Sequence, residues 1–215
     1  MQIKTTNDGS KTLFVPELNE HYHSIHVSYN EAVHVFINAG LAFLNKENYK
    51  VFEVGFGTGL NTWLSADYAN SNKVSIDYYG IEKYPVDLSI AKQMEYTDND
   101  ISKQLFDHIH ELPWEEKCSI SDHFTLTKYQ ADLDVFTIPK ELDLVYFDAF
   151  APEKQENMWT KEIFSKLYDS LCSGGVLVTY CAKGVIRRRM QFIGFEVSRI
   201  PGPPGKREML RAIKP

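Results

Sequence analysis

A glycine-rich stretch between an apolar run and a helix-like segment is the feature that most constrains this chain. Residues 51–54 form the apolar run, residues 60–68 form the helix-like segment, and Gly55, Gly57 and Gly59 lie between them. This order predicts a strand, a tight turn and the start of a helix. Glycine has no Cβ and tolerates positive φ, so a ligand can lie against the turn. The free N–H groups of the first helical turn would face that ligand.

The spacing of these glycines narrows the choice of ligand. The dinucleotide-binding fingerprint needs its third glycine at the position where Leu60 stands. The stretch instead reads acidic-x-Gly-x-Gly-x-Gly from Glu53, and it resembles the first motif of class I S-adenosylmethionine (SAM) methyltransferases. On this motif alone, a glycine-rich turn in another α/β protein remains the alternative. The resemblance implies a SAM site that includes Glu53, Gly55, Phe56, Gly57, Thr58, Gly59 and Asn61.

Composition and cysteine usage indicate a folded protein without a disulfide framework. A length of 215 residues suits one domain with a sizeable core. No apolar run reaches the roughly 18 to 20 residues that cross a membrane, and the N-terminus lacks the apolar core of a signal peptide. The sequence therefore predicts a cytoplasmic protein. Cys118, Cys172 and Cys181 are widely spaced and form no Cys-x-x-Cys pair, which favours buried thiols over a disulfide or a zinc site.

Charge is distributed unevenly along the chain. The net charge is −6, but residues 183–215 carry nine Lys and Arg against two acidic residues, a net charge of +7. A basic end on an acidic body can hold a polyanion locally, although a solvated, salt-bridged surface is the alternative. We expect salt-dependent phosphate contacts, which do not read sequence, from Lys183, Arg187, Arg188, Lys206 and Arg207.

The N-terminal segment has a hairpin pattern followed by a polar stretch. Residues 3–15 alternate around Asp8-Gly9, a typical hairpin turn. Residues 17–26 are polar and without a clear period, which favours a loop that covers a pocket. Their three histidines lack a carboxylate in metal-ligand register, so a metal site is not favoured. The chain is expected to divide into a hairpin with its covering loop, 1–27, and a Rossmann-like domain, 28–215.

Alternating strand and helix patterns fill the rest of the chain. They indicate a doubly wound α/β sheet of seven strands, mostly parallel, with an antiparallel closing strand. Ser28 and Glu31 form a capping-box pattern at the start of the first helix. We expect strands at 51–54, 74–81, 124–129, 142–147, 176–180, 195–200 and 208–213, and helices at 28–44, 60–68, 87–95, 101–110, 158–171 and 185–192.

Acidic residues follow three of the predicted strands, at the edge where ligands bind in open parallel sheets. Glu82 lies about twenty residues past the glycines, so we expect its carboxylate to accept from the ribose hydroxyls; an exposed strand-end acid is the alternative. Asp132 is expected to accept from the adenine amine, unless it caps a following helix. Lys83 and Ala131, beside these acids, are assigned to the same cofactor site. Asp148 is assigned both to this site and to catalysis.

Further motifs accompany the glycine stretch in a fixed order. They are Glu53–Asn61, Glu82–Pro85, Asp148–Lys154 with Met158-Trp159, Arg187-Arg188 before Gly194-Phe195, and Gly205–Leu210. Together they resemble the methyltransferase half of the MnmC enzymes and its stand-alone form, MnmD. The resemblance extends over nearly the whole chain from about Glu31 onward.

This resemblance implies a class I SAM-dependent methyltransferase fold and a specific reaction. The family methylates the amine of 5-aminomethyl(-2-thio)uridine at the wobble position of tRNA, so the anticodon stem-loop would be the partner. MnmC also has an FAD-dependent half, which a chain of this length cannot hold, so only the last methylation is expected. Ala149 replaces a common glycine, and residues 155–157 replace a usual Asn-Pro step; both departures touch the pocket rim.

The expected chemistry needs a neutral, well-oriented amine. Asp148 can accept a hydrogen bond from that amine and stabilise the charge that develops on nitrogen. Positioning the two reactants should supply most of the rate, and no metal is required. Phe150 and Pro152 are expected to pack on the uracil, with Lys154 in the same substrate-binding set.

Three other functions share parts of this pattern. A polyamine aminopropyltransferase has a similar fold and a pocket aspartate. Its polycationic substrate would need a pocket with more acidic residues, and the basic C-terminal segment argues against that. An NAD-dependent oxidoreductase is disfavoured by Leu60. A non-catalytic RNA-binding module is disfavoured because the acidic residues after the strands are all present.

Overall fold

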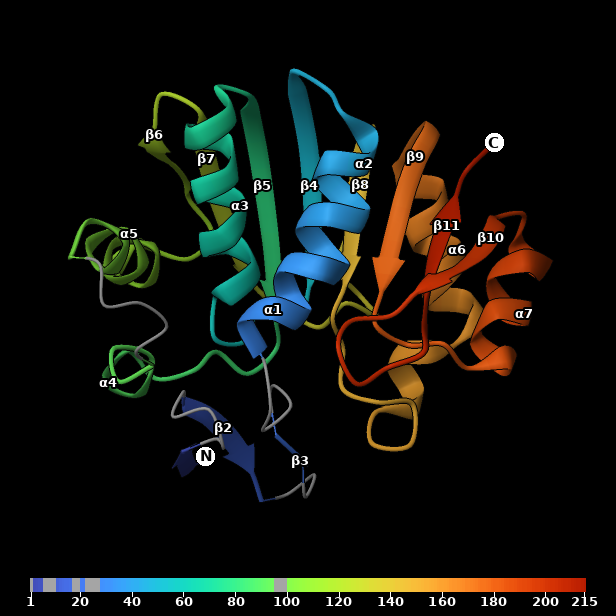
Figure 1. Ribbon diagram of the computed structural model, residues 1–215, viewed down its shortest axis with the longest axis horizontal. Helices are drawn as coiled ribbons and strands as arrows, with labels where there is room; N and C mark the ends of the chain where they lie inside the picture. The colour runs from blue at the N-terminus through green and yellow to red at the C-terminus, as the bar shows by residue number, and fades with distance from the viewer. Residues whose placement is uncertain (1, 6–10, 17–19, 22–27, 95–99) are drawn as a thin grey trace.

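The computed structural model describes residues 2–5, 11–16, 20–21, 28–94 and 100–215, and it is organised around a central sheet (Figure 1). The eight strands of this sheet lie in the order β10-β11-β9-β8-β4-β5-β7-β6. The five central strands pair in parallel, whereas β11 is antiparallel to both its neighbours and β6 is antiparallel to β7. The bounds are β4 (Asn48–Val54), β5 (Ser75–Glu82), β6 (Lys117–Ser121), β7 (Phe124–Gln130), β8 (Leu142–Phe147), β9 (Leu171–Thr179), β10 (Glu196–Pro201) and β11 (Glu208–Ile213).

The mostly parallel sheet and its antiparallel closing strand are confirmed, but the expected count of seven strands is wrong. The additional strand is β6, which is short, polar and without a buried residue. An edge strand has a partner on one side only, and its side chains need not alternate between core and solvent. Strand β9 also begins five residues before the expected start at 176.

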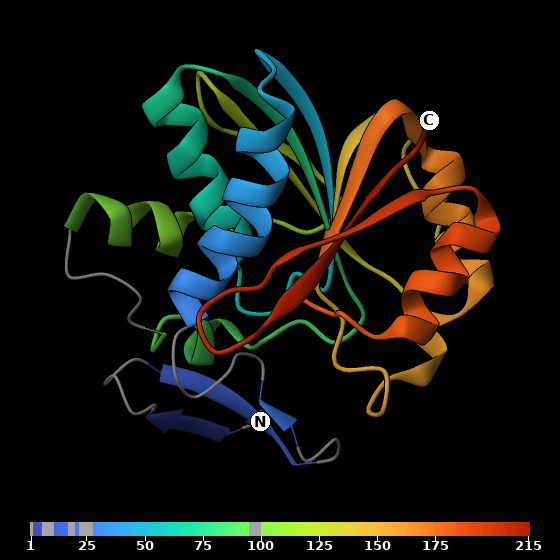
Figure 2. The ribbon, with the colours of Figure 1, turned by 45° about the vertical axis from the view of Figure 1, so that its right-hand side comes forward.

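Helices cover both faces of the sheet (Figures 1 and 2). Successive side chains of a strand point to opposite faces, so both faces carry apolar residues that need cover. In β4, Val51 packs in one apolar cluster and Phe52 in the other, as expected for a side-chain period of two. The first cluster contains the helix over 28–44, α3 (Leu60–Asn72) and α5 (Asp100–Glu111), and the second contains α6 (Lys161–Ser170) and α7 (Gly184–Ile193).

The expected helix over 28–44 is continuous but changes its winding. It consists of α1 (Ser28–Ala32), the π-helical segment η1 (Val33–Leu41) and α2 (Ala42–Leu44). Gly40 lets η1 lie close to β8, since a Cβ there would be 3.2 Å from side-chain carbons of Leu144 and Tyr146. The helix ends at Asn45, which has a left-handed φ of 48°.

Two other expected helices are shorter or divided. The one predicted at 87–95 is α4 (Leu88–Ala91), capped by Asp87, whose side chain accepts from the Ser89 N–H. The one predicted at 158–171 is divided into the 3₁₀ helix η2 (Glu156–Trp159) and α6. Thr160 separates them because its hydroxyl accepts from the Ile163 N–H and begins a new helix.

A small antiparallel sheet precedes the main fold. Strands β1 (Gln2–Thr5) and β2 (Lys11–Val15) pair as the predicted hairpin, and β2 also pairs with an unexpected strand, β3 (Glu20–His21). Figures 1 and 2 show this sheet at the end of the molecule where the parallel strands end. Its fully buried Leu13 belongs to the first apolar cluster. The hairpin turn and most of the expected covering loop lie outside the described residues, and the domain boundary after residue 27 stays a prediction.

In the part of the chain that the structure describes, no helix combines the length and apolar character that a membrane span requires.

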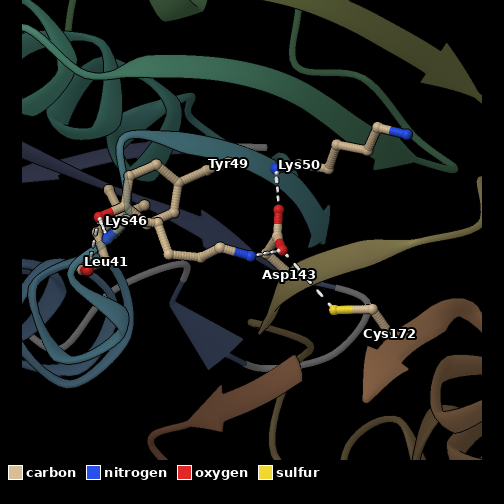
Figure 3. Close-up of polar contacts among 6 residues, drawn as sticks. All are labelled: Leu41, Lys46, Tyr49, Lys50, Asp143 and Cys172. Atoms are coloured by element: carbon tan, nitrogen blue, oxygen red, sulfur yellow. Dashed lines mark hydrogen bonds and ion pairs between the residues drawn. The ribbon is translucent and has the colours of Figure 1, made fainter. Parts of the chain in front are cut away.

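At the opposite edge of the sheet, Asp143 joins the starts of three strands to the end of α2 (Figure 3). Its Oδ2 accepts from the Lys50 N–H at 2.7 Å, and its Oδ1 accepts from the Lys46 ammonium. The Cys172 thiol donates to the same Oδ1 at 3.7 Å. Burial, followed by the charge of Asp143, raises the pKa of Cys172, which favours the neutral form of this partly exposed thiol.

We therefore expect Asp143→Ala to destabilise the fold by about 1–2 kcal/mol, because it removes the hydrogen bonds that the Lys50 N–H and the Lys46 ammonium donate. Urea unfolding followed by circular dichroism measures the change. Asp67→Ala, on the exposed face of α3, is the matched control and should stay within about 0.5 kcal/mol of the parent. Equal midpoints for the two variants would contradict this role of Asp143.

Candidate cofactor and amine site

The glycine turn follows β4 and leads directly into α3, as the sequence predicts. The φ values of Gly55, Gly57 and Gly59 are 87°, 52° and 74°, in the left-handed region that residues other than glycine rarely adopt. The N–H groups of Gly55 and Phe56 both donate to the Ile81 carbonyl at 3.1 Å, which ties the turn to β5. The Thr58 side chain is buried in the turn.

Asp148 lies directly against Gly55. In the parallel register of β4 and β8, Val54 is opposite Phe147, and the Asp148 N–H donates to the Val54 carbonyl at 3.0 Å. A Cβ at position 55 would lie 2.6 Å from the Asp148 carbonyl oxygen, so only glycine fits here without a backbone shift.

Glu82 lies on the other side of the turn. Val54 is also opposite Ile81 of β5, so Glu82 and Asp148 flank Gly55 at the same edge of the sheet. The Glu82 carboxylate accepts from the Gly57 N–H at 3.1 Å and from the Tyr84 N–H at 3.0 Å. Burial raises the pKa of Glu82, and these backbone donors oppose the increase. A carboxylate has about four acceptor positions, so capacity remains for ligand hydroxyls.

The Asp148 carboxyl group is held by Asn61, on the first turn of α3. Asn61 Nδ2 donates to Asp148 Oδ2 at 2.9 Å. Burial raises the pKa of Asp148 to about 7; the hydrogen bond from Asn61 and the charge of Lys206 lower it, and the charge of Glu31 raises it. A group with this pKa exchanges its proton near neutral pH, which suits an acceptor of amine protons.

Glu53 is fully buried beneath the turn. Its Oε2 accepts from the Thr62 and Tyr78 hydroxyls, both at 2.8 Å. Burial raises the pKa of Glu53 to about 8, against the hydrogen bonds from its neighbours. Its side chain therefore faces the packed interior between α3 and β5.

The residues predicted to hold the adenine are gathered beyond β5 and β7. The Ala131 N–H donates to the Glu82 carbonyl at 3.1 Å. The Asp132 carboxylate accepts from Lys83 at 2.7 Å and from the Asp134 N–H at 3.1 Å. Lys83 holds the pKa of Asp132 below its usual range. The alternative role of Asp132, as the cap of a following helix, is wrong because the segment after it is a turn.

Sequence reasoning missed three residues that pack around the predicted Phe56 and the turn: His110, Trp114 and Lys128. His110, near the end of α5, makes a 3.0 Å hydrogen bond with the Thr58 carbonyl through Nε2. Burial lowers the pKa of His110 to about 4, so the ring is neutral. The buried Phe56 ring packs edge-on against His110 and Trp114. Lys128, buried on β7, donates to the Ile109 and His110 carbonyls at 2.8 and 3.2 Å.

The rim beyond Asp148 is fixed by hydrogen bonds to its backbone. The Phe150 N–H donates to Gln155 Oε1 at 3.1 Å, and Trp159 Nε1 donates to the Phe150 carbonyl at 2.8 Å. Tyr180 donates to the Ala149 carbonyl at 2.8 Å. Phe150 itself, with Pro152 and Lys154, is partly exposed. Gln155, one of the departures from the family pattern, thus shapes the rim through its side chain.

The basic residues predicted for phosphate contacts differ in their surroundings. Lys183 pairs with Glu153. Lys206 pairs with Glu31, the residue expected in a capping box, and its Nζ lies 4.6 Å from the centre of the Tyr180 ring. Arg188 and Arg207 are exposed, whereas Arg187 is partly buried. The charge of Lys206 lowers the pKa of Asp148, and the ligand contacts of all these residues stay predictions.

The close contact at Gly55 gives a direct test of the turn. We expect Gly55→Ala to destabilise the protein by about 3–5 kcal/mol, because the new Cβ must displace the Asp148 backbone. Gly174→Ala is the matched control: its φ of 78° is equally left-handed, but a Cβ there meets nothing within 4 Å. It should cost only about 1–2 kcal/mol. Denaturant unfolding of both variants gives the two free energies of unfolding. Their difference separates the cost of the steric contact at position 55 from the cost of a left-handed φ.

Comparison with known proteins identifies the class of this site. Residues 93–215 match a family model described as S-adenosyl-L-methionine-dependent methyltransferase. The bifunctional protein MnmC of Cupriavidus metallidurans, named for tRNA 5-methylaminomethyl-2-thiouridine biosynthesis, is 30% identical over 95% of this chain and 32% of its own length. MnmC of Leptospira interrogans is 26% identical over 90% of this chain and 32% of its own length. The chain thus spans about a third of these curated relatives, and the resemblance to MnmC is confirmed.

Solved structures agree on the fold. The crystal structure of MnmC2 from Aquifex aeolicus matches with a TM-score of 0.80 and 22% identity, covering all of this chain and 72% of that one. The SAM-bound amino pentose methyltransferase CalS10 from Micromonospora echinaspora matches with a TM-score of 0.52 and 11% identity, over 87% and 92% of the two chains.

The residues present fit SAM. A Cβ at Gly55 would lie 2.6 Å from the Asp148 carbonyl oxygen and a Cβ at Gly59 would lie 2.9 Å from His110 Nε2, so glycine is required at both positions of the turn. Partly exposed carboxyl groups flank the turn on either side. These features agree with the family match over more than half of the chain. The chain therefore belongs to the S-adenosyl-L-methionine-dependent methyltransferase family, and SAM is its cofactor.

Proposed function

We propose that the chain transfers a methyl group from SAM to the primary amine of 5-aminomethyl(-2-thio)uridine at the wobble position of tRNA. The observation that carries this proposal is the Asp148 carboxyl group, which Asn61 holds beside the glycine turn at 2.9 Å. The names of the MnmC relatives support the substrate class. The anticodon stem-loop would be the part of the tRNA that binds.

The glycine turn and the acids beside it would hold the cofactor. Glu82 would accept from the ribose hydroxyls with the acceptor positions that Gly57 and Tyr84 leave free. Asp132, together with Lys83 and Ala131, would lie at the adenine. Bound SAM supplies an electrophilic methyl group on a positively charged sulfur.

Asp148 would select and orient the amine. A primary alkylamine is mostly protonated near pH 7, and only its neutral form has the lone pair that attacks a methyl group. Asp148 can accept a hydrogen bond from the amine and stabilise the positive charge that develops on nitrogen. Its pKa of about 7 also allows it to take up a proton. Holding both reactants in line then contributes most of the rate.

The rim would receive the uracil ring. The Phe150 backbone is fixed at both ends, by Gln155 and by Trp159, so its position does not depend on the substrate. We assign Phe150 and Pro152 to packing on the base, and Lys154 to the same rim. A rim backbone that is already in place needs no ordering when substrate binds, which lowers the entropic cost of binding.

The proposal is tested with tRNA from a strain that lacks the final methylation. The protein, SAM and this tRNA are incubated, and the nucleosides are separated and identified by mass spectrometry. The proposal requires conversion of the 5-aminomethyl nucleoside to its 5-methylaminomethyl form. Methylation elsewhere in the tRNA, or no methylation with active SAM binding, would overturn the substrate assignment.

Asp148→Asn is expected to lower kcat about 100-fold while SAM still binds, because the amide cannot accept a proton. In the parent enzyme kcat should rise as Asp148 ionises around pH 7, since the raised pKa keeps it protonated below that value. The variant should lose this part of the pH profile. Asp67→Asn on α3 makes the same chemical change at an exposed position and should leave kcat unaltered. A variant profile identical to that of the parent would remove Asp148 from catalysis.

Neutralising Arg187, Arg188, Lys206 and Arg207 together is expected to weaken tRNA binding and to flatten its salt dependence. Each lost phosphate contact should lower the slope of log affinity against log salt by about one. Filter binding at several salt concentrations measures the slope. Lys50→Gln with Lys103→Gln removes exposed charge elsewhere and serves as the control. An unchanged slope in the fourfold variant would mean that the basic end is only a solvated surface.

A further inference from the structure

The loop between β10 and β11 has a closed conformation that fixes the backbone of Lys206. The Gly202 N–H donates to the Arg207 carbonyl at 3.2 Å, and the Lys206 N–H donates to the Pro203 carbonyl at 2.9 Å. A Cβ at Gly202 would lie 2.5 Å from the Lys206 carbonyl oxygen, so the two sides of the loop touch. Pro203 is buried, although Lys206 is exposed. The loop therefore holds the start of an exposed lysine side chain in one place.

Two contacts join this loop to the first helix. The Lys206 ammonium pairs with the Glu31 carboxylate of α1. His34 Nε2 of η1 makes a 2.9 Å hydrogen bond with the Pro201 carbonyl at the end of β10. Glu31 and His34 are three residues apart, so they occupy neighbouring positions on one helix face. Figures 1 and 2 show the loop beside the start of this helix, and the loop is thus held on the helix near both of its ends.

The Lys206 ammonium also lies over an aromatic ring that leads to Asp148. Its Nζ is 4.6 Å from the centre of the Tyr180 ring, within the range of a cation–π contact. The Tyr180 hydroxyl donates to the Ala149 carbonyl at 2.8 Å, and Ala149 is the residue after Asp148. A continuous series of contacts therefore runs from Lys206 through Tyr180 to the backbone beside the proposed amine acceptor.

The next peptide group is held in the same way. Trp159 packs edge-on against Tyr180, with ring centres 6.3 Å apart, and Trp159 Nε1 donates to the Phe150 carbonyl at 2.8 Å. The carbonyls of the two residues after Asp148 are thus each bound by a donor from one of two packed rings. Lys206 contacts one of these rings, so it bears on the backbone that follows Asp148.

The pairing with Glu31 makes Lys206 a poor phosphate contact. A lysine and a carboxylate in contact carry no net charge, so a phosphate that approached them would release few counterions. Arg207, the next residue, is exposed, and none of the ion pairs between described residues involves it. Two neighbouring basic residues of one loop therefore have different surroundings.

We propose that Lys206 is a positioning residue of the amine site, which holds the 202–207 loop and the Tyr180 ring in place beside Asp148 instead of binding a tRNA phosphate. The inference rests on the proposed methyl transfer, and it replaces the phosphate contact predicted for Lys206. With Tyr180 fixed, the Ala149 carbonyl stays bound, and the Asp148 carboxyl group keeps the direction in which it would meet the amine. A displacement of about 1 Å at such a group can lower a rate about 100-fold.

Lys206 and Glu31 also have opposite effects on the charge of Asp148. Burial has the largest effect and raises the pKa of Asp148; the hydrogen bond from Asn61 lowers it, the charge of Glu31 raises it and the charge of Lys206 lowers it. Glu53 of β4 is a further acid coupled to Asp148, although burial dominates its pKa. Loss of one partner of the ion pair should therefore shift the pKa of Asp148, upward without Lys206 and downward without Glu31.

Lys206→Met is expected to lower kcat about tenfold, with little change in the KM for tRNA or in the salt dependence of tRNA binding. Lys206→Arg keeps the charge and can stack on the ring, so it should restore kcat to within about threefold of the parent. Arg207→Met, in the same loop, should instead weaken tRNA binding and lower the salt slope by about one. Lys103→Met removes an exposed lysine on α5 and should match the parent. An unaltered kcat with a lowered salt slope in Lys206→Met would overturn the proposal.

The route through Tyr180 is tested by combining two changes. Tyr180→Phe removes the hydroxyl that binds the Ala149 carbonyl and keeps the ring. If Lys206 acts through this hydroxyl, the double variant of Lys206→Met and Tyr180→Phe should be within about twofold of the slower single variant. Losses in kcat that multiply would show that the two residues act independently, and the positioning role through Tyr180 would be wrong.

The pH dependence of kcat gives a readout that a merely structural role would not move. Parent kcat should rise around pH 7, where Asp148 ionises. The midpoint of this rise should move to higher pH in Lys206→Met and to lower pH in Glu31→Gln, and the double variant should return it toward the parent. Identical midpoints in all four proteins would contradict the proposal.

Carbon-13 NMR of aspartate carboxyl groups gives the same comparison without tRNA or SAM. The Asp148 resonance is assigned by its loss in Asp148→Asn. Its titration midpoint should rise in Lys206→Met and fall in Glu31→Gln. If none of the proteins methylates the tRNA, the proposed function fails, and these midpoints still decide whether Lys206 acts on Asp148. Equal midpoints in the parent and both variants would refute the inference.

Discussion

The contact between Gly55 and the backbone of Asp148 is the constraint on which the site depends. A Cβ at position 55 would lie 2.6 Å from the Asp148 carbonyl oxygen, so the turn after β4 can pass this close to the segment after β8 only through glycine. The parallel register then sets Glu82 and Asp148 on either side of the same residue. Two acids that are 66 positions apart in the sequence become neighbours of one turn through hydrogen bonding between strands.

The turn is held in place by contacts within the protein. Neutral His110 contacts the Thr58 carbonyl, and Phe56 packs so closely on β5 that a Cβ on Gly80 would lie 2.8 Å from its ring. Lys128 fixes the end of α5 by donating to carbonyls of its last turn. The helix dipole also stabilises a cation at this end. Because these contacts exist before any ligand binds, little ordering remains to be done on binding.

The sequence predicts those parts of the fold that have a strong local pattern. Strands β8 and β11 begin and end at the predicted residues, because alternation and flanking turn residues agree there. Edge strand β6 has no such pattern. Lys128 could have been found from the sequence. It shares its face of β7 with the buried Phe124 and Leu126, so a charged residue occupies a core position. The contact between Glu31 and Lys206 spans 175 positions. The loop between the last two strands was predicted, but no local pattern predicts that it packs against the first helix.

The acids at this edge share one electrostatic problem and solve it differently. Burial raises the pKa of Glu53, Glu82 and Asp148. Three neighbouring carboxylates, of which Glu53 is fully buried and the other two are partly exposed, cannot all keep their charge without compensation. Glu82 is compensated by backbone N–H donors, and Asp148 by an amide and a nearby ammonium. Glu53 has only neutral side-chain donors, the Thr62 and Tyr78 hydroxyls and the Asn61 amide, and it is fully buried, so it is the acid whose charge costs most. Environment rather than residue type therefore decides which carboxyl groups can face a cationic ligand as anions.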